Sequence, residues 1–117
     1  MACGTAIATI NHIRGETIRF ALRSDPAYNG TETVTCVVKL AVNKVEVPPA
    51  SAPVVYTITP VFVPGSDAYW QFEIPPSQTE MMTPAHYITD AKIVYYGTGE
   101  VDKPLPLAIC LAEAVTA

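Results

Sequence analysis

The sequence predicts an all-β domain, an antiparallel β-sandwich of about seven strands with one short helical turn, and three observations lead to it. Half of the 117 residues are hydrophobic and only 15% are charged, so the chain can bury a core as a single domain over residues 1–117. Eleven prolines are spread along the sequence and exclude long helices. Between the prolines lie β-branched and aromatic runs that alternate with polar residues, as half-buried strands do.

The first half of the chain contains three predicted strands, at residues 5–10, 16–23 and 33–42. In the second of them, Ile18, Phe20 and Leu22 share one face because side chains alternate along a strand. Gly30 lies in a predicted turn, where glycine supplies a positive φ. In the third strand Lys39 is expected to point outward. The side chains expected to point inward there are Val34, Cys36, Val38, Leu40 and Val42.

A proline-rich segment at 43–53 is predicted to form an extended loop, because proline and alanine favour a polyproline-like path without internal hydrogen bonds. Residues 54–63 follow as a strand pair, or as one strand broken at Pro60. Residues 69–74 alternate cleanly and predict a further strand. Its apolar face consists of Trp70, Phe72 and Ile74.

The helical turn is predicted at 75–83, where Ser77 and Glu80 have the spacing of a capping box. Three elements follow: a long strand at 86–96, a hairpin turn at 97–99 and a last strand at 105–115. Asp90 lies on an apolar face of the long strand and is expected to hydrogen-bond backbone amides of a loop. The last strand is apolar on both faces, so it is expected to be central in a sheet or covered by a partner.

Several of these segments resemble a known family. They are IRGETIRF at 13–20, WQFEI at 70–74, PSQT at 76–79, TPAHY at 83–87, DAKI at 90–93, GTG at 97–99 and AVT at 114–116. The pattern is similar to that of the small immunoglobulin-like β-sandwich domains of tailed-bacteriophage virions, found at the N-termini of baseplate upper proteins and in related tail or capsid decoration proteins. The chain departs from it at Ala85-His86, where a glycine often precedes the tyrosine, and in the insertion at 48–53.

The resemblance implies an immunoglobulin-like fold and a structural protein of the virion. Such a protein would be made in the host cytoplasm, and multiple copies would lie on the tail, the baseplate or the capsid surface. Its partners would be other virion subunits, most simply further copies of the same chain. The motifs that carry the resemblance determine the fold and imply no catalytic residue.

Charge and hydropathy exclude two classes of partner. Seven Lys and Arg stand against eleven Asp and Glu, a net charge of −4, whereas a nucleic-acid-binding domain needs a basic face. No run of about 18 apolar residues is present, so no membrane-spanning segment is expected, and the N-terminus does not have the pattern of a signal peptide. Residues 1–47 carry five basic and four acidic groups, whereas residues 48–117 carry two and seven, an asymmetry that head-to-tail packing could use.

No combination of residues predicts catalysis, a cofactor or a metal site. His12 and His86 have no ligand spacing with each other or with cysteine, and neither a G-x-S-x-G motif nor a glycine-rich phosphate loop is present. We therefore expect a non-enzymatic protein. Cys3, Cys36 and Cys110 are too widely spaced for a disulfide framework, and free thiols are expected, with a Cys36–Cys110 bridge left open.

Assembly with other protein subunits is the function that the residues favour. The surface of a small soluble protein commonly carries about 25–35% charged residues, whereas this chain has 15% and a mean hydropathy of +0.26. The candidate interface residues are Ile7, Ile10, Val45, Val47, Pro48, Pro49, Pro53, Tyr96, Leu105 and Leu107. The alternative is a carbohydrate- or receptor-binding module that stacks a glycan on exposed aromatic rings, with Tyr69 and Tyr96 as candidates.

Overall fold

The computed structural model describes residues 9–24, 27–41, 51–104 and 106–113. These residues form nine strands and one short helix: β1 (Thr9–Ile13), β2 (Ile18–Leu22), β3 (Thr33–Leu40), β4 (Tyr56–Ile58), β5 (Val61–Val63), β6 (Tyr69–Ile74), α1 (Pro76–Thr79), β7 (Ala85–Val94), β8 (Val101–Asp102) and β9 (Ala108–Ala112). The prediction of an all-β sandwich is confirmed, with two very short strands, β4 and β5, on either side of Pro60 and a further one, β8, after the hairpin turn.

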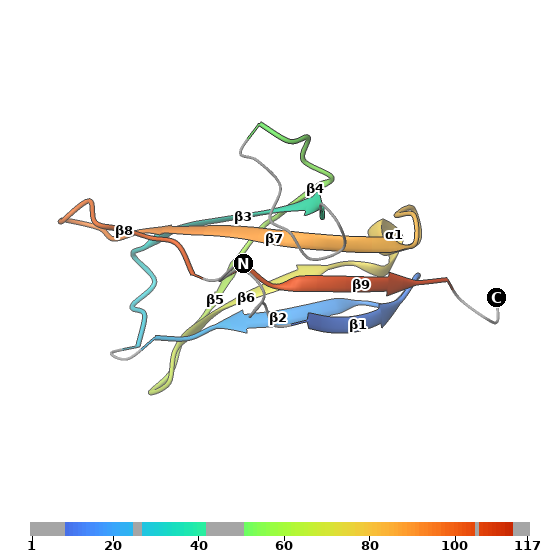
Figure 1. Cartoon of the computed structure of the whole chain (residues 1–117). Coiled ribbons are helices and arrows are strands. Elements are labelled where there is room, and N and C mark those ends of the chain that lie inside the picture. Colours follow the sequence, from blue (N-terminus) through green and yellow to red (C-terminus); the bar gives the residue numbers. More distant parts are fainter. Residues whose placement is uncertain (1–8, 25–26, 42–50, 105, 114–117) are drawn as a thin grey trace.

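Two sheets face each other across the core (Figure 1). The six-stranded sheet has the order β1-β9-β7-β3-β4, with β8 beside β7, and the three-stranded sheet has the order β2-β6-β5. The pairing of β1 with β9 is parallel, with Thr9 opposite Ala108, so the prediction of an antiparallel sandwich is wrong for this one pair. β1 and β9 are far apart in the sequence, and residues 14–17 lead from β1 into β2 of the other sheet. No hairpin therefore joins β1 to β9, and the pair is free to be parallel.

Paired strands of the smaller sheet provide one wall of the core. Ile18 lies opposite Ile74 and Phe20 opposite Phe72, as their alternation predicts. The rings of Phe20 and Phe72 are stacked with their centroids 5.1 Å apart. Trp70 is half-buried and packs against the same cluster. From the larger sheet and its connections the buried apolar residues are Tyr28, Val34, Cys36, Val38, Ile58, Met82, Tyr87, Ile93, Ile109 and Leu111.

The end of β3 differs from the prediction. Lys39, expected outside, is only 5% exposed, and Leu40, expected inside, is 54% exposed. The alternation of the strand is kept, because Lys39 lies opposite Ile88, which is also buried. The error therefore concerns which face is covered: at this end of β3 the outer face is buried and the core-side face is open to solvent.

The helix begins earlier than the capping box predicts. Its N-cap is Pro75, no side chain caps it, and the prediction of Ser77 as the cap is wrong. Proline at the first helical position has the φ that a helix needs, which explains the earlier start. The buried hydroxyl of Thr79 donates to the carbonyl of Glu16 at 2.7 Å and accepts from the amide of Gly15 at 3.2 Å. These bonds fix the helix to the turn between β1 and β2.

Tyr87 anchors the start of β7. Its hydroxyl donates to the carbonyl oxygen of Thr83 at 2.6 Å, and the residue is 2% exposed. A tyrosine that bonds back to the chain a few residues upstream, at the corner between the two sheets, is a recurring feature of immunoglobulin-like sandwiches.

We expect Tyr87→Phe to lower the free energy of unfolding by about 1–2 kcal/mol, because it removes this bond and leaves a carbonyl oxygen without its partner. Urea denaturation followed by fluorescence measures the effect. Tyr69→Phe is the matched control, since the Tyr69 hydroxyl makes no hydrogen bond among the described residues. Equal losses in both variants would contradict a specific role for the Tyr87 hydroxyl.

The predicted last strand begins later than expected and is a central strand. β9 lies between β1 and β7, and Ala108 and Ile109 are fully buried, which explains its apolar character on both faces. Residues 103–107, which include Pro104 and Pro106, separate it from β8. Leu107 already pairs with β7, because its carbonyl accepts from the amide of Thr89 at 3.0 Å and its amide donates to the Thr89 hydroxyl at 3.0 Å.

The two described cysteines are free and lie on opposite faces of the larger sheet. Cys36 is in the core, where burial raises the pKa of its thiol to about 12. Cys110 is half-buried on the outer face, opposite His86. Free thiols are therefore present and a Cys36–Cys110 bridge is not formed. No helix among the described residues is long and apolar enough to cross a membrane.

Candidate functional site

The hairpin that joins β7 to β8 projects from one end of the sandwich (Figure 1). The amide of Tyr95 donates to the carbonyl of Glu100 at 2.9 Å, and the amide of Gly99 donates to the carbonyl of Tyr95 at 3.0 Å. Gly97 and Gly99 both have positive φ, which this tight turn requires. The glycine turn was predicted from the sequence, whereas the return strand β8 was not.

Apolar side chains cover the outer surface of this hairpin. Tyr96 is 82% exposed and Val101 is 51% exposed. Val101 lies opposite Val94 in the β7–β8 pairing, and Val94 is half-buried. We call Val94, Tyr96 and Val101 the hairpin patch. Tyr96 was predicted as an interface residue, whereas Val101 was missed because its sequence surroundings predict no strand.

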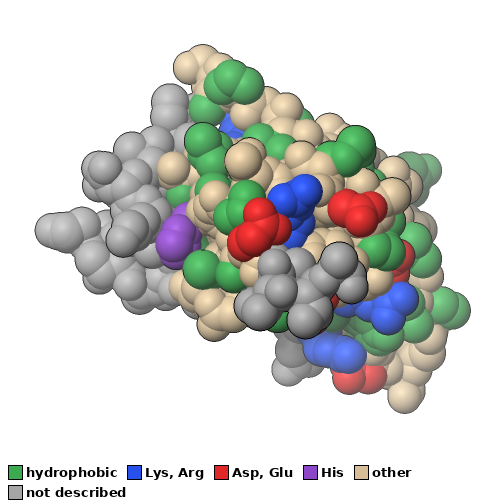
Figure 2. Space-filling model, turned by 90° about the vertical axis from the view of Figure 1, so that its right-hand side faces the viewer, with side chains coloured by type: hydrophobic (Ala, Val, Ile, Leu, Met, Phe, Trp, Pro, Cys, Tyr) green, Lys and Arg blue, Asp and Glu red, His purple; other side chains and the backbone are tan. Residues whose placement is uncertain are grey.

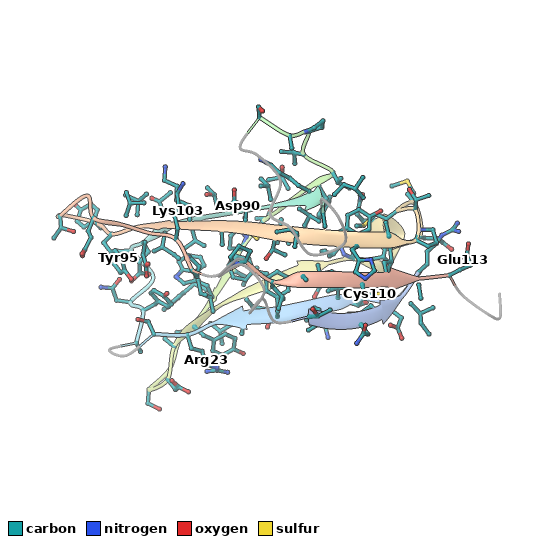
Figure 3. All side chains as sticks on the ribbon, viewed as in Figure 1. Arg23, Asp90, Tyr95, Lys103, Cys110 and Glu113 are labelled. Atoms are coloured by element: carbon teal, nitrogen blue, oxygen red, sulfur yellow. The ribbon has the colours of Figure 1, made fainter. Side chains whose placement is uncertain are left out.

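The base of the hairpin is held by packed aromatic rings. Tyr28, from the loop between β2 and β3, is 6% exposed and stacks on Tyr95 with a centroid distance of 6.5 Å. Burial, together with the neighbouring Tyr95 and Asp102, raises the pKa of Tyr28 to about 12. Figure 3 shows Tyr95 at the hairpin end of the molecule. The hairpin patch therefore lies next to the packed rings of Tyr28 and Tyr95, which hold the base of the hairpin in place.

Glu32 fixes the loop between β2 and β3 at the same end. Its carboxylate accepts hydrogen bonds from the amides of Asn29 at 3.0 Å and Gly30 at 3.1 Å and from Nε1 of Trp70 at 3.1 Å. Burial alone would raise the pKa of Glu32, but these hydrogen bonds outweigh it and hold the pKa below its ordinary value. Glu32, and not Asp90, thus accepts hydrogen bonds from the backbone amides of a loop, and Asp90 is exposed.

A second exposed apolar surface lies at the opposite end of the larger sheet. Leu40 is 54% exposed, Val54 is 49% exposed and Val55 is 38% exposed, and Pro53 is also exposed. The amide of Val55 donates to the carbonyl of Val38 at 2.8 Å, one residue out of the β3–β4 register, so the chain bulges just before β4, next to the end of β3 where Leu40 lies. We call these four residues the edge patch.

The two patches are well separated. Thr33 begins β3 opposite Val94 of the hairpin patch, and Leu40 of the edge patch ends it. A strand of eight residues spans roughly 23 Å between its first and last residues. Figure 2 faces the α1 end of the molecule and shows hydrophobic side chains among separate acidic and basic ones.

The other predicted interface residues are placed differently. Ile10 is half-buried in β1 and packs against the core, and Leu107 is half-buried before β9. The remaining candidates lie outside the described residues, as do positions 5–8 of the first predicted strand and 43–50 of the proline-rich loop. Those candidates are Ile7, Val45, Val47, Pro48, Pro49 and Leu105.

Tyr69 and Tyr96, the candidate glycan-stacking residues, belong to different sheets. Tyr69 begins β6 in the smaller sheet, whereas Tyr96 follows β7 in the larger one. The guanidinium of Arg23 lies 4.1 Å from the centre of the Tyr69 ring, and its NH1 donates to Oδ2 of Asp67 at 3.0 Å. One face of the Tyr69 ring is therefore occupied by a cation, and the two rings do not form a common platform.

Within the described parts of the chain, no group of three or more His, Cys, Asp or Glu side chains could hold a metal ion. Comparison with known proteins adds no assignment: no protein-family model matches the sequence, and no curated protein is similar to it. The candidate site therefore depends on the geometry of the chain itself, which places five of the eight exposed large hydrophobic residues of its described part in the two patches.

Proposed function

We propose that the protein is a non-enzymatic structural subunit that assembles in multiple copies on a particle such as the virion of a tailed phage. The sequence resemblance to virion domains supports this, and so does the fold. In immunoglobulin-like sandwiches of the constant type the first, second, fifth and fourth strands form one sheet and the third, sixth and seventh form the other. The chain departs from this division at β1, which lies beside β9 in the larger sheet. The orders β2-β6-β5 and β9-β7-β3-β4, together with the Tyr87 corner, support an immunoglobulin-like topology.

The observation that carries the proposal is the presence of two different apolar patches at opposite ends of one sheet. A contact between the hairpin patch of one copy and the edge patch of the next would bury Tyr96 and Val54 together. Such a head-to-tail contact uses two different surfaces, so it continues into a ring or an open chain of subunits. Each contact is small, and repetition on a symmetric particle strengthens the whole assembly.

We expect the wild-type protein to form concentration-dependent oligomers larger than dimers in analytical ultracentrifugation. Tyr96→Asp disables the hairpin patch and Val54→Asp disables the edge patch, because each places a charge in a contact that must lose water. Each variant alone should sediment as a monomer. An equimolar mixture should form a dimer and stop there, since each partner keeps one functional patch.

The control is Val61→Asp, which places the same charge on an apolar residue that is 56% exposed on β5, outside both patches. This variant should assemble like the wild type. A wild-type protein that remains monomeric at all concentrations would overturn the proposal. Self-association of Val54→Asp alone would overturn the head-to-tail arrangement, because it would show contact between two hairpin patches.

A further inference from the structure

A hollow of about 290 Å³ lies at the edge of the smaller sheet, where β5 begins. β6 pairs with β2 over five residues, 70–74, but with β5 only over 69–71. The chain leaves the larger sheet after β4 and joins β5 at Pro60, which has no amide hydrogen to extend the ladder. Beyond Gln71, no described strand pairs with β6 on this side, and the hollow lies in the space left there.

The walls of the hollow combine apolar and polar groups. Its lining consists of Tyr56, Thr59, Val61, Gln71, Glu73 and Pro75. Val61 lies opposite Gln71 in the register, and Glu73 follows on the same face because side chains alternate along β6. Tyr56 comes from β4 of the other sheet and packs against the core with part of its ring. The hollow is thus lined from both sheets.

The polar groups of the hollow have unused hydrogen-bonding capacity. The side chains of Tyr56, Thr59 and Gln71 make no hydrogen bond within the described structure. Oε1 of Glu73 accepts from Nε of Arg19 at 2.7 Å, while its Oε2 has no partner there. Since Arg19 compensates the charge of Glu73, the hollow offers hydrogen-bond donors and acceptors with no net charge.

We propose that this hollow binds one neutral saccharide unit of a glycan. A sugar ring presents apolar C–H faces, which fit the side chains of Val61, Pro75 and Tyr56, and hydroxyl groups on its rim. These hydroxyls can donate to Oε2 of Glu73 and accept from the side-chain amide of Gln71. The volume is at the lower limit of small-molecule sites, roughly 300–1,000 Å³, which fits a single unit. The net charge of −4 disfavours acidic sugars.

The test is a nuclear magnetic resonance titration of the full chain with glucose, galactose, N-acetylglucosamine and, as an acidic sugar, glucuronic acid. An open site of this size predicts weak, millimolar binding. At least one neutral sugar should shift the amide signals of residues 56–59, 61 and 71–74 in a saturable way. Gln71→Leu should weaken that binding by roughly tenfold, because one hydrogen-bonding group is lost. Gln78→Leu, in α1, is the matched control and should bind like the wild type.

The outcomes separate this inference from the assembly proposal. Tyr96→Asp should bind the sugar normally, and Gln71→Leu should still assemble, because the hollow lies outside both patches. If none of the neutral sugars shifts these signals, or only glucuronic acid does, the saccharide assignment is wrong. Sugar-induced shifts confined to Tyr69 or Tyr96 would place the glycan on exposed rings and would likewise overturn it.

Discussion

Phe72→Ala is expected to lower the free energy of unfolding by about 3–5 kcal/mol. Phe72 is 1% exposed at the centre of β6, and its ring stacks on Phe20, so truncation removes a large buried area and a ring contact and leaves a cavity between the sheets. A domain of this size commonly has only about 5–15 kcal/mol of stability. The melting temperature, measured by circular dichroism, should therefore fall by roughly 10–20 °C.

The matched control for this variant is Tyr96→Ala, which removes an aromatic ring that is 82% exposed. It should change the stability of the monomer by less than about 0.5 kcal/mol. A small loss in Phe72→Ala, similar to that of the control, would show that the two sheets do not pack on each other through this ring.

Glu32→Gln is expected to lower the free energy of unfolding by about 2–3 kcal/mol at pH 7, because bonds to a charged acceptor are stronger than those to a neutral one. Glu32 is 7% exposed and accepts hydrogen bonds from two loop amides and from Trp70. The substitution keeps the shape of the side chain but turns an amide group toward these donors. Urea denaturation followed by Trp70 fluorescence measures the loss.

The pH dependence of this difference follows from the pKa of Glu32. The pKa is lowered in the folded protein from 4.5, so the charged carboxylate stabilises the fold above that value. The contribution is lost as the pH falls through the lowered, folded-state pKa. The gap in stability between wild type and Glu32→Gln should therefore be full at pH 7 and become smaller in acid. Glu80→Gln, at an exposed position, should show no such gap, and a gap that persists unchanged in acid would contradict this role of Glu32.

Alternation along the strands allowed much of the sandwich to be predicted. Ile18 and Phe20 face the core, as do Phe72 and Ile74, because each of these strands has one apolar row and one polar row. Pro60 marks the switch between sheets, where β4 ends and β5 begins. These features depend on the local chain, so the sequence contains the information needed to find them.

The features that were missed depend on what covers a residue. Lys39 follows the alternation but is buried, and the alternation of a strand does not say whether its outer face is covered. Glu32 and Asp90 are both carboxylates, and Glu32 becomes the buried acceptor through the amides of its own turn, Asn29 and Gly30, and through Trp70 from the other sheet. Leu40 belongs to the edge patch because the core-side face of β3 is uncovered at the end of the strand. No pattern in the neighbouring residues indicates this.

The pairing of β1 with β9 has a consequence for how the chain folds during synthesis. Arg14, directly after β1, forms an ion pair with Glu113, directly after β9, although they are 99 positions apart. Contacts between such distant positions slow folding because a long loop must close first. One border of the larger sheet can therefore form only when β9 has left the ribosome. Until then β7, which pairs with β9 in the finished sheet, exposes backbone groups that could pair with a neighbouring nascent chain.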